Sequence, residues 1–343
     1  MDKIQLTLHK NYVSEWDIKY AIREIIQNIK DNPSEDIINI KDGVLFLGNK
    51  EGALDRKTLL LGNSTKDTNE TIGKFGEGYK LALLVLLRLG VKTTIYTGDE
   101  IWEPSFEKHR ALDEDVLTIT IRKNRKKDNA GILYKLENIK EQYTLEELLD
   151  SIILSTDRFS QVYEGDKVSI YEADNQDDDG KLFINGMFIT QIANFNYSYD
   201  FKPEVLNVGR DRNIVDEFDV CYATSQAWSH VKDQKVVLDL MRENKPEIKF
   251  IHHWKYRIDK SVIESLALEY ANYIPVSYND EIKTIQDRYD TGKYQFKVVP
   301  SFIKDLLPKL NLAPKKKLSR EEFQNKYKKY FTKRMLADWN NLR

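Results

Sequence analysis

Apolar residues first alternate with polar ones and then recur at helical spacing. Ile4, Leu6 and Leu8 alternate with polar neighbours, which predicts a short strand. Residues 15–30 then carry a stripe that predicts an amphipathic helix, formed by Ile18, Ala21, Ile22, Ile25, Ile26 and Ile29. Ser14 is the expected N-cap of this helix, with Asp17 as a variant of the capping box.

Short apolar runs then predict a hairpin and a second helix. Residues 37–40 and 44–47 flank Asp42-Gly43, a strong signal for a tight turn. A polar stretch at 63–71 leads through a glycine cluster into an apolar helix at 81–89, which Gly90 closes. We expect further strands at 93–96, 116–121 and 132–136.

The second half of the chain indicates more α/β structure followed by helices. Thr144 and Glu147 predict a helix start, and strands are expected at 168–171 and 181–189, joined by a solvated acidic hairpin turn at 174–179. After Asp216 the pattern is mostly helical. We therefore predict three parts: 1–145, an α/β segment at 146–218, and a mostly helical region at 219–343 with a basic tail.

Composition narrows the class of protein. The chain of 343 residues is too long for one ordinary domain. Its net charge of -2, from 53 basic and 55 acidic residues, does not support nucleic-acid binding over the whole surface, although local basic patches are possible. A single cysteine, Cys221, rules out a disulfide within the chain. The longest apolar run, Leu81–Leu87, is too short to span a bilayer. We expect a soluble, cytoplasmic protein with no membrane partner.

Three polar residues share one face of the first predicted helix. At about 100° per residue, Glu24, Asn28 and Asp31 point the same way, among apolar neighbours. Buried carboxylates without partners are costly, so a ligand that needs an oxygen-rich site would explain the triplet. A solvated helix edge is the alternative that the triplet alone leaves open.

A glycine cluster opens the second predicted helix. Gly73, Gly76 and Gly78 would let the backbone approach a phosphate, and the helix start that follows offers free N–H groups. The cluster is not part of a βαβ unit, which argues against a Rossmann site. It also lacks the Gly-Lys-Ser/Thr of a P-loop.

In this order, the two motifs resemble those of a known superfamily. Glu-x-x-x-Asn-x-x-Asp on an early helix, a hairpin, a polar stretch and Gly-x-x-Gly-x-Gly are similar to the N-box and lid region of GHKL ATPases, over residues 10–136. The superfamily comprises gyrase, heat-shock chaperones, histidine kinases and MutL. Three further stretches (181–186, 195–197 and 209–213) resemble prokaryotic and viral chaperone-like members. The resemblance implies an α/β Bergerat sandwich, then a smaller transducer-like segment and a mostly helical C-terminal region.

The resemblance also implies roles for the helix triplet. Glu24 matches the general base of ATP-hydrolysing members, and histidine kinases usually carry asparagine there. Asn28 matches the residue that coordinates magnesium, and Asp31 matches the second acid of the N-box. ATP and Mg²⁺ are therefore the expected ligands.

Phosphate contacts are implied for the loops. Gly73, Gly76 and Gly78 match the box that wraps the phosphates, and the residues among them are Lys74, Phe75 and Glu77. Ser64, Thr65 and Lys66 fall in the lid stretch. Lys80 is a further candidate, with a solvated lysine as the alternative. Arg210 or Arg212 could sense the γ-phosphate, or both could form an ion-pair cluster with Asp211.

One motif departs from the family. The usual Asp-x-Gly-x-Gly after the hairpin, whose aspartate accepts a bond from adenine, is replaced by Gly48-Asn49-Lys50-Glu51-Gly52. Asn49 is the expected substitute, because an amide oxygen can accept the same bond. Asp42 is the alternative, although a turn role suits it better. Adenine stays the expected base, and a relaxed preference is left open.

The favoured hypothesis is a slow ATPase that acts as a conformational switch. Closure over residues 63–71 would accompany ATP binding and promote homodimerisation, with a protein partner still to be identified. One alternative is an interaction module with little turnover that captures a partner protein, as in conflict between phage and host. Another is a DNA-associated ATPase that uses the basic tail after Pro314.

Overall fold

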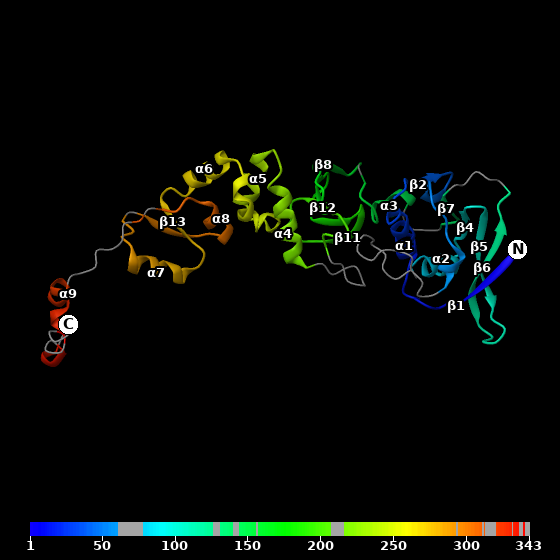
Figure 1. Ribbon diagram of the computed structural model, residues 1–343, viewed down its shortest axis with the longest axis horizontal. Coiled ribbons are helices and arrows are strands. Elements are labelled where there is room, and N and C mark those ends of the chain that lie inside the picture. Colours follow the sequence, from blue (N-terminus) through cyan, green and yellow to red (C-terminus); the bar gives the residue numbers. More distant parts are fainter. Residues whose placement is uncertain are drawn as a thin grey trace. The chain divides into compact units, whose positions relative to one another are not determined.

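The computed structural model describes most of the chain. The described residues are 1–60, 78–125, 131–139, 144–155, 157–206, 216–292, 294–310, 312, 320–330, 332–335 and 339. Two compact units are present (Figure 1): one holds residues 1–232 and 245–250, the other residues 233–244 and 251–343. The predicted domain boundaries after residues 145 and 218 both fall within the first unit, and they stay predictions.

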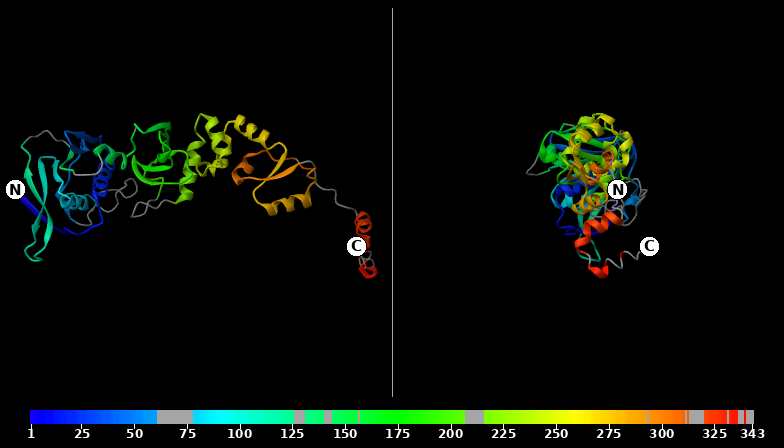
Figure 2. Two further views of the ribbon diagram at one scale, coloured as in Figure 1. Left: turned by 180° about the vertical axis from the view of Figure 1, so that it is seen from behind. Right: turned by 90° about the vertical axis from the view of Figure 1, so that its left-hand side faces the viewer.

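A seven-stranded antiparallel sheet forms the base of the first unit. Its strand order is β1-β6-β5-β4-β7-β3-β2. The strands are β1 (Asp2–His9), β2 (Asp36–Lys41), β3 (Val44–Asn49), β4 (Lys92–Thr97), β5 (Glu100–Lys108), β6 (Asp115–Lys123) and β7 (Ile132–Glu137). Helices α1 (Ile18–Lys30) and α2 (Gly78–Arg88) pack together on one side of this sheet (Figures 1 and 2). The predicted α/β class is confirmed.

The helices bury their apolar stripes against the sheet. Ile22, Ile25 and Ile26 of α1 have no exposed surface, and they share a core with residues 82–86 of α2. Leu45 and Leu47 of β3 meet them from the sheet. The stripe predicted for α1 is therefore confirmed. Burial of such side chains contributes about 1.5–3 kcal/mol each, so the core fixes where α1 lies.

The start of α1 differs from the prediction. The N-cap is Asp17, whose carboxylate accepts the Tyr20 N–H at 3.0 Å, and not Ser14. Val13 adopts a left-handed backbone with φ of 48°, so the chain is still turning at residue 14. A cap needs an extended backbone directly before the first helical turn, and Asp17 provides it.

The hairpin is confirmed, and one strand of this seven-stranded sheet was missed. Asp42 and Gly43 both take positive φ, 53° and 72°, as a two-residue turn of this kind requires. Strand β5 was not predicted, because Pro104 interrupts its pattern. Pro104 pairs with Ile119 of β6 and lies beyond the three residue pairs that join β5 to β4, so the proline is tolerated there.

A second sheet follows in the same unit. Its order is β11-β10-β12-β9-β8. The strands are β8 (Phe159–Tyr163), β9 (Val168–Ala173), β10 (Lys181–Ile184), β11 (Met187–Gln191) and β12 (Ser198–Phe201). Helix α3 (Leu145–Asp150) leads into it and begins after Thr144, as predicted; Thr144 and Glu147 form a capping box there.

Two predictions for this sheet are wrong. The strand expected at 181–189 is a hairpin, because Asn185 and Gly186 take positive φ and turn the chain between β10 and β11. Residues 174–179 are not a hairpin turn, because β12 lies between β9 and β10. They include the short helix η2 (Gln176–Asp178), and Asp178 is buried in ion pairs with Arg158 and Lys181 rather than solvated.

Helix α4 (Glu217–Trp228) and the short helix η3 (Pro246–Ile248) complete the first unit. The second unit is built mainly of helices, with a parallel pair of strands that was not predicted. Its elements are α5 (Gln234–Arg242), η4 (Ile251–Arg257), α6 (Lys260–Glu269), β13 (Tyr273–Val276), α7 (Asn279–Arg288), β14 (Gln295–Val298), α8 (Ser301–Leu306), α9 (Arg320–Tyr327) and η5 (Lys328–Tyr330). Among the residues described above, no helix has the length and apolar character needed to cross a membrane.

Candidate functional site

The predicted polar face lies along the second half of α1. Glu24, Asn28 and Asp31 are all half-buried. A ligand-binding face and a solvated helix edge both stay predictions for this triplet. The Asn28 side chain donates from Nδ2 to the Glu24 carbonyl oxygen at 2.7 Å, which fixes the orientation of its amide. Asp31 is the C-cap of the helix and brings a carboxylate to the negative end of the helix dipole. The face is rich in oxygen acceptors.

The last glycine of the cluster touches this face. A Cβ atom added to Gly78 would stand 1.8 Å from Glu24 Oε2 and 3.0 Å from Glu24 Cδ. The Glu24 carboxylate therefore occupies the space that any other side chain at position 78 would need. The structure brings the last glycine of the cluster to the first residue of the helix triplet, at the point where α2 begins.

Asn49 lies beneath the same end of α1. It is buried at the end of β3, and its Nδ2 donates to the Ile29 carbonyl oxygen at 3.1 Å and to Asp36 Oδ1 at 3.3 Å. Asp36 also forms an ion pair with Lys30 at 2.8 Å. The end of β3 is thus attached to the last turn of α1. Asp42 lies in the turn between β2 and β3, which agrees with the turn role that the sequence favoured over a contact with adenine.

Lys80 is not a solvated lysine. It has no exposed surface, and its ammonium group donates to the carbonyl oxygens of Thr58 at 2.8 Å and Leu60 at 2.6 Å. Its neighbour Tyr79 shares a 2.8 Å hydrogen bond with the Thr58 hydroxyl, and burial raises the pKa of Tyr79 to about 12. Both side chains tie the first turn of α2 to the short helix η1 (Arg56–Leu59). Sequence reasoning missed this role because a lysine at a helix start normally faces water.

Most of the predicted loop residues lie outside the described residues. These are Ser64, Thr65, Lys66, Gly73, Lys74, Phe75, Gly76 and Glu77, together with Arg210 and Arg212. The implied phosphate contacts and γ-phosphate sensor therefore stay predictions. Residues 315–319 of the basic tail also lie outside the described residues, and the contact of this tail with DNA stays a prediction.

The second sheet contacts α1 at the same end. Asn185, in the turn between β10 and β11, donates from Nδ2 to the Lys30 carbonyl oxygen at 2.8 Å. Asp200 accepts the Gly186 N–H at 2.8 Å and so supports that turn, and burial raises the pKa of its carboxyl group. The Asn-Gly pair was the sequence signal that could have revealed this hairpin.

This arrangement can serve one kind of chemistry well. Two carboxylates and an amide lie on one helix face, next to glycine backbone at the start of another helix. Oxygen donors of this kind suit magnesium, and a carboxylate beside a phosphate-binding turn can accept a proton from water. The residues present therefore fit a magnesium–nucleotide ligand.

Three kinds of comparison relate the chain to known proteins. No family model matches the chain. An uncharacterized protein of Mycoplasma pneumoniae is 26% identical over 206 residues, which cover 56% of this chain and 81% of that protein. Among solved structures, the N-terminal domain of a DNA repair protein has a TM-score of 0.34 and 8% identity, covering 72% of this chain and 97% of that one. The B subunit of DNA gyrase from Myxococcus xanthus has a TM-score of 0.27 and 7% identity, covering 58% and 83%.

Proposed function

We propose that the chain binds magnesium–ATP on the polar face of α1 and hydrolyses it slowly, as a GHKL-type ATPase. The contact between Gly78 and the Glu24 carboxylate carries this proposal. It joins the first residue of the helix triplet to the last glycine of the cluster, which lie 54 positions apart in the sequence.

Each residue of the face has a proposed task. Asn28 would hold magnesium through its amide oxygen, because its Nδ2 is turned toward the Glu24 carbonyl group. The metal would neutralise part of the phosphate charge. Glu24 would accept the proton of the attacking water, a task that typically contributes about 10²–10⁴-fold to the rate. Asp31, as the second acid of the N-box, would accept hydrogen bonds close to the inner end of the bound nucleotide.

Asn49 would take the place of the usual adenine-contacting aspartate. Its Nδ2 is committed to Ile29 and Asp36, so its Oδ1 is the atom that could accept a bond from the adenine amino group. An amide is a weaker acceptor than a carboxylate. We therefore propose a preference for adenine over guanine that is present but modest.

The nucleotide would act on the rest of the chain through α1. The last turn of this helix holds Asn49 on one sheet and receives Asn185 from the other. A ligand that favours one position of α1 would shift both contacts, which is how a nucleotide can bias two conformations. A protein partner, and closure as a homodimer, belong to this proposal.

A measurement of ATP hydrolysis distinguishes an ATPase from an interaction module that binds ATP without hydrolysing it. We would measure phosphate release and ATP affinity for the wild type, for Glu24→Gln, and for Glu15→Gln on the exposed segment before α1 as a matched control. Glu24→Gln should keep ATP affinity within a few-fold and lose about 100-fold or more of its turnover. Tight ATP binding with no turnover in the wild type would instead favour the interaction module.

A further inference from the structure

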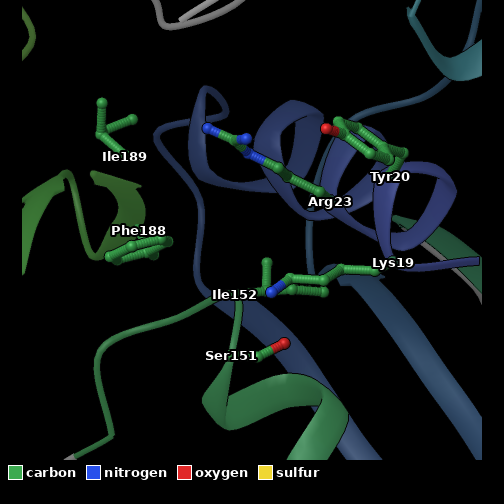
Figure 3. Close-up of a pocket in the computed structure, with 7 residues that line it drawn as sticks. All are labelled: Lys19, Tyr20, Arg23, Ser151, Ile152, Phe188 and Ile189. Atoms are coloured by element: carbon green, nitrogen blue, oxygen red, sulfur yellow. The ribbon is translucent and has the colours of Figure 1, made fainter. Parts of the chain in front are cut away.

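The cavity beside the first half of α1 does not select a ligand by charge. It has a volume of about 220 Å³, and Figure 3 shows Lys19 and Arg23 of α1 on one side and Phe188 of β11 on the other. Lys19 is exposed and attracted by Asp17, and Arg23 already has an interaction partner. The surface that fits a partner lies instead in the second unit, at the edge of its small sheet.

The sheet of the second unit consists of two parallel strands. Strands β13 and β14 pair from Tyr273–Gln295 to Val276–Val298, and α7 connects them. Most sheets have about four to six strands, and parallel strands are normally covered on all sides. No third strand is present in the described part of this unit. Each of the two strands therefore has one outer edge.

Alternate residues of β14 direct their backbone groups away from β13. The Val299 N–H donates to the Val276 carbonyl oxygen at 2.8 Å, and the Gln295 N–H also donates toward β13, at 3.1 Å. Because backbone groups alternate between the two edges of a strand, the N–H and C=O groups of Phe296 and Val298 point outward. Among the residues that the structure describes, none forms a hydrogen bond with these four groups.

The outer edge of β13 offers no comparable donors. The same alternation directs Tyr273 and Pro275 outward, and Ser277 follows them. The Tyr273 N–H donates to the Tyr270 carbonyl oxygen at 2.9 Å. Pro275 has no N–H, and the Ser277 N–H donates to Glu281 Oε2 at 2.9 Å. Proline and engaged donors protect an edge from pairing, so β14 carries the edge that can accept another strand.

The outward residues of β14 extend an apolar face of the sheet. Phe296 pairs with Ile274 and Val298 pairs with Val276, so these four side chains share one face. Ile274 and Val276 are buried and Phe296 is half-buried, whereas Val298 keeps 53% of its surface exposed. An apolar side chain on a neighbouring strand would cover Val298.

Lys297 places a positive charge on the opposite face. Its Nζ lies 4.7 Å from the centroid of the Tyr270 ring and 5.2 Å from that of the Tyr273 ring. The two rings hold the ammonium group in place but do not neutralise it. The lysine is exposed, and it forms no ion pair with the carboxylates that the structure describes. Carboxylates on a neighbouring strand would complement this charge.

We propose that the outer edge of β14 pairs with an extended segment of a partner protein in which apolar and acidic residues alternate. The backbone of the segment bonds to Phe296 and Val298, its apolar side chains cover Val298, and its carboxylates meet Lys297. A second copy of the chain fits less well. The antiparallel register that uses both outward residues would place the two Lys297 side chains opposite each other.

Amide resonances of the full chain, isotopically labelled on phenylalanine and valine, test this pairing. The probes are three synthetic peptides, in which valine alternates with glutamate, valine alternates with lysine, or serine alternates with glutamate. The glutamate–valine peptide should shift Phe296 and Val298 but not Val116 of the first sheet. It should bind about tenfold more tightly than the lysine–valine peptide and several-fold more tightly than the glutamate–serine peptide. The titrations need no nucleotide, so their outcome is independent of the ATP site.

Two N-methylated forms of the glutamate–valine peptide show whether the strand edge is responsible. One form carries methyl groups on the valine nitrogens and the other on the glutamate nitrogens. Only one of them blocks the edge that faces β14, because N–H groups alternate between the two edges of a strand. We expect one form to lose about tenfold in affinity and the other to keep it. Equal affinities of the two forms would contradict pairing at the edge.

Variants show whether Lys297 selects the acidic segment. Lys297→Glu should reverse the preference, so that the lysine–valine peptide binds more tightly than the glutamate–valine peptide. Lys283→Glu, at an exposed position of α7, should leave the preference unchanged. The proposal is overturned if the glutamate–valine peptide does not shift Phe296 and Val298, or if Lys297→Glu keeps the preference of the wild type. It is also overturned if dilution of the chain alone shifts these two resonances, which would identify a second copy as the occupant.

Discussion

At the scale of single residues, the candidate site depends on a few close contacts that a sequence shows only in part. Helical periodicity places Glu24 and Asn28 on one face, and the resemblance to GHKL ATPases predicts that they act together with the glycine cluster. The sequence could not show that Gly78 would touch Glu24, since that contact depends on how two helices pack. It also could not show the burial of Lys80, because both of its partners are backbone carbonyl groups, which leave no trace in residue identity.

Gly78→Ala should disable the site without unfolding the protein. The new methyl group would stand where Glu24 Oε2 now lies, so the carboxylate must move. A displacement of about 1 Å at a reacting group can cost about 100-fold in rate. We expect ATP turnover to fall by about that factor in a phosphate-release assay.

Gly43→Ala is the matched control for that variant. Gly43 has positive φ and open space around it, so the substitution strains the hairpin turn by about 1–2 kcal/mol but leaves Glu24 alone. It should lower the melting temperature and keep turnover. Equal turnover in Gly78→Ala and the wild type would mean that Glu24 does not act from its present position.

Lys80→Met tests the structural role assigned to this lysine. Removing the ammonium group leaves the Thr58 and Leu60 carbonyl groups without their charged donor, which should cost about 3 kcal/mol of the free energy of unfolding. Urea denaturation measures this directly. Lys41→Met, at an exposed position, should stay within about 0.5 kcal/mol of the wild type. A lysine that serves only as a phosphate ligand would give the reverse: unchanged stability and weakened ATP binding.

At the scale of elements, local patterns were reliable where one feature decided the structure. The stripe of α1, the Asp-Gly turn and the helix start at Thr144 were all predicted correctly, because spacing or turn chemistry alone determines them. The wrong predictions concern strands, because the structure of a strand segment depends on which other strands it pairs with. Strands β9 and β10 are consecutive in the chain but β12 separates them, and no local pattern contains that information.

A buried carboxyl group ties three elements of the first unit together. Glu247 of η3 has no exposed surface and accepts the Asn196 N–H at 3.1 Å and the Tyr199 hydroxyl at 3.0 Å. The Tyr199 oxygen accepts in turn from Trp228 Nε1 of α4 at 2.8 Å. Burial raises the pKa of Glu247 to about 7.

This group should make stability depend on pH near neutrality. The folded-state pKa lies above the unfolded value of about 4.3, so the folded chain binds more protons between the two values. The stabilisation is fully present below pH of about 4 and is lost as the pH rises to about 7. We expect the wild type to lose about 2 kcal/mol between pH 5.5 and pH 8, relative to Glu247→Gln, in paired denaturation curves. Parallel pH profiles for the two proteins would contradict a raised pKa.

At the scale of the whole molecule, α1 is the element that joins the parts of the first unit. Its apolar side lies in the core of the seven-stranded sheet, and its last turn accepts hydrogen bonds from Asn49 and from Asn185. The sequence predicted that this helix carries chemistry. It could not predict the link to the second sheet, which depends on the turn at Asn185 and on the order of strands. We expect a substitution at one of these contacts of α1 to change the other contacts of the helix as well.

Calorimetric titration of the full chain with magnesium–ATP tests the central claim most directly. The comparison is between the wild type, Asn28→Ala, and Asn39→Ala at an exposed position of β2. We expect saturable binding in the wild type and in Asn39→Ala, a loss of at least tenfold in affinity in Asn28→Ala, and weaker binding of GTP than of ATP. A folded wild type that binds no nucleotide, or an Asn28→Ala variant that binds like the wild type, would contradict a magnesium–ATP site on this face of α1.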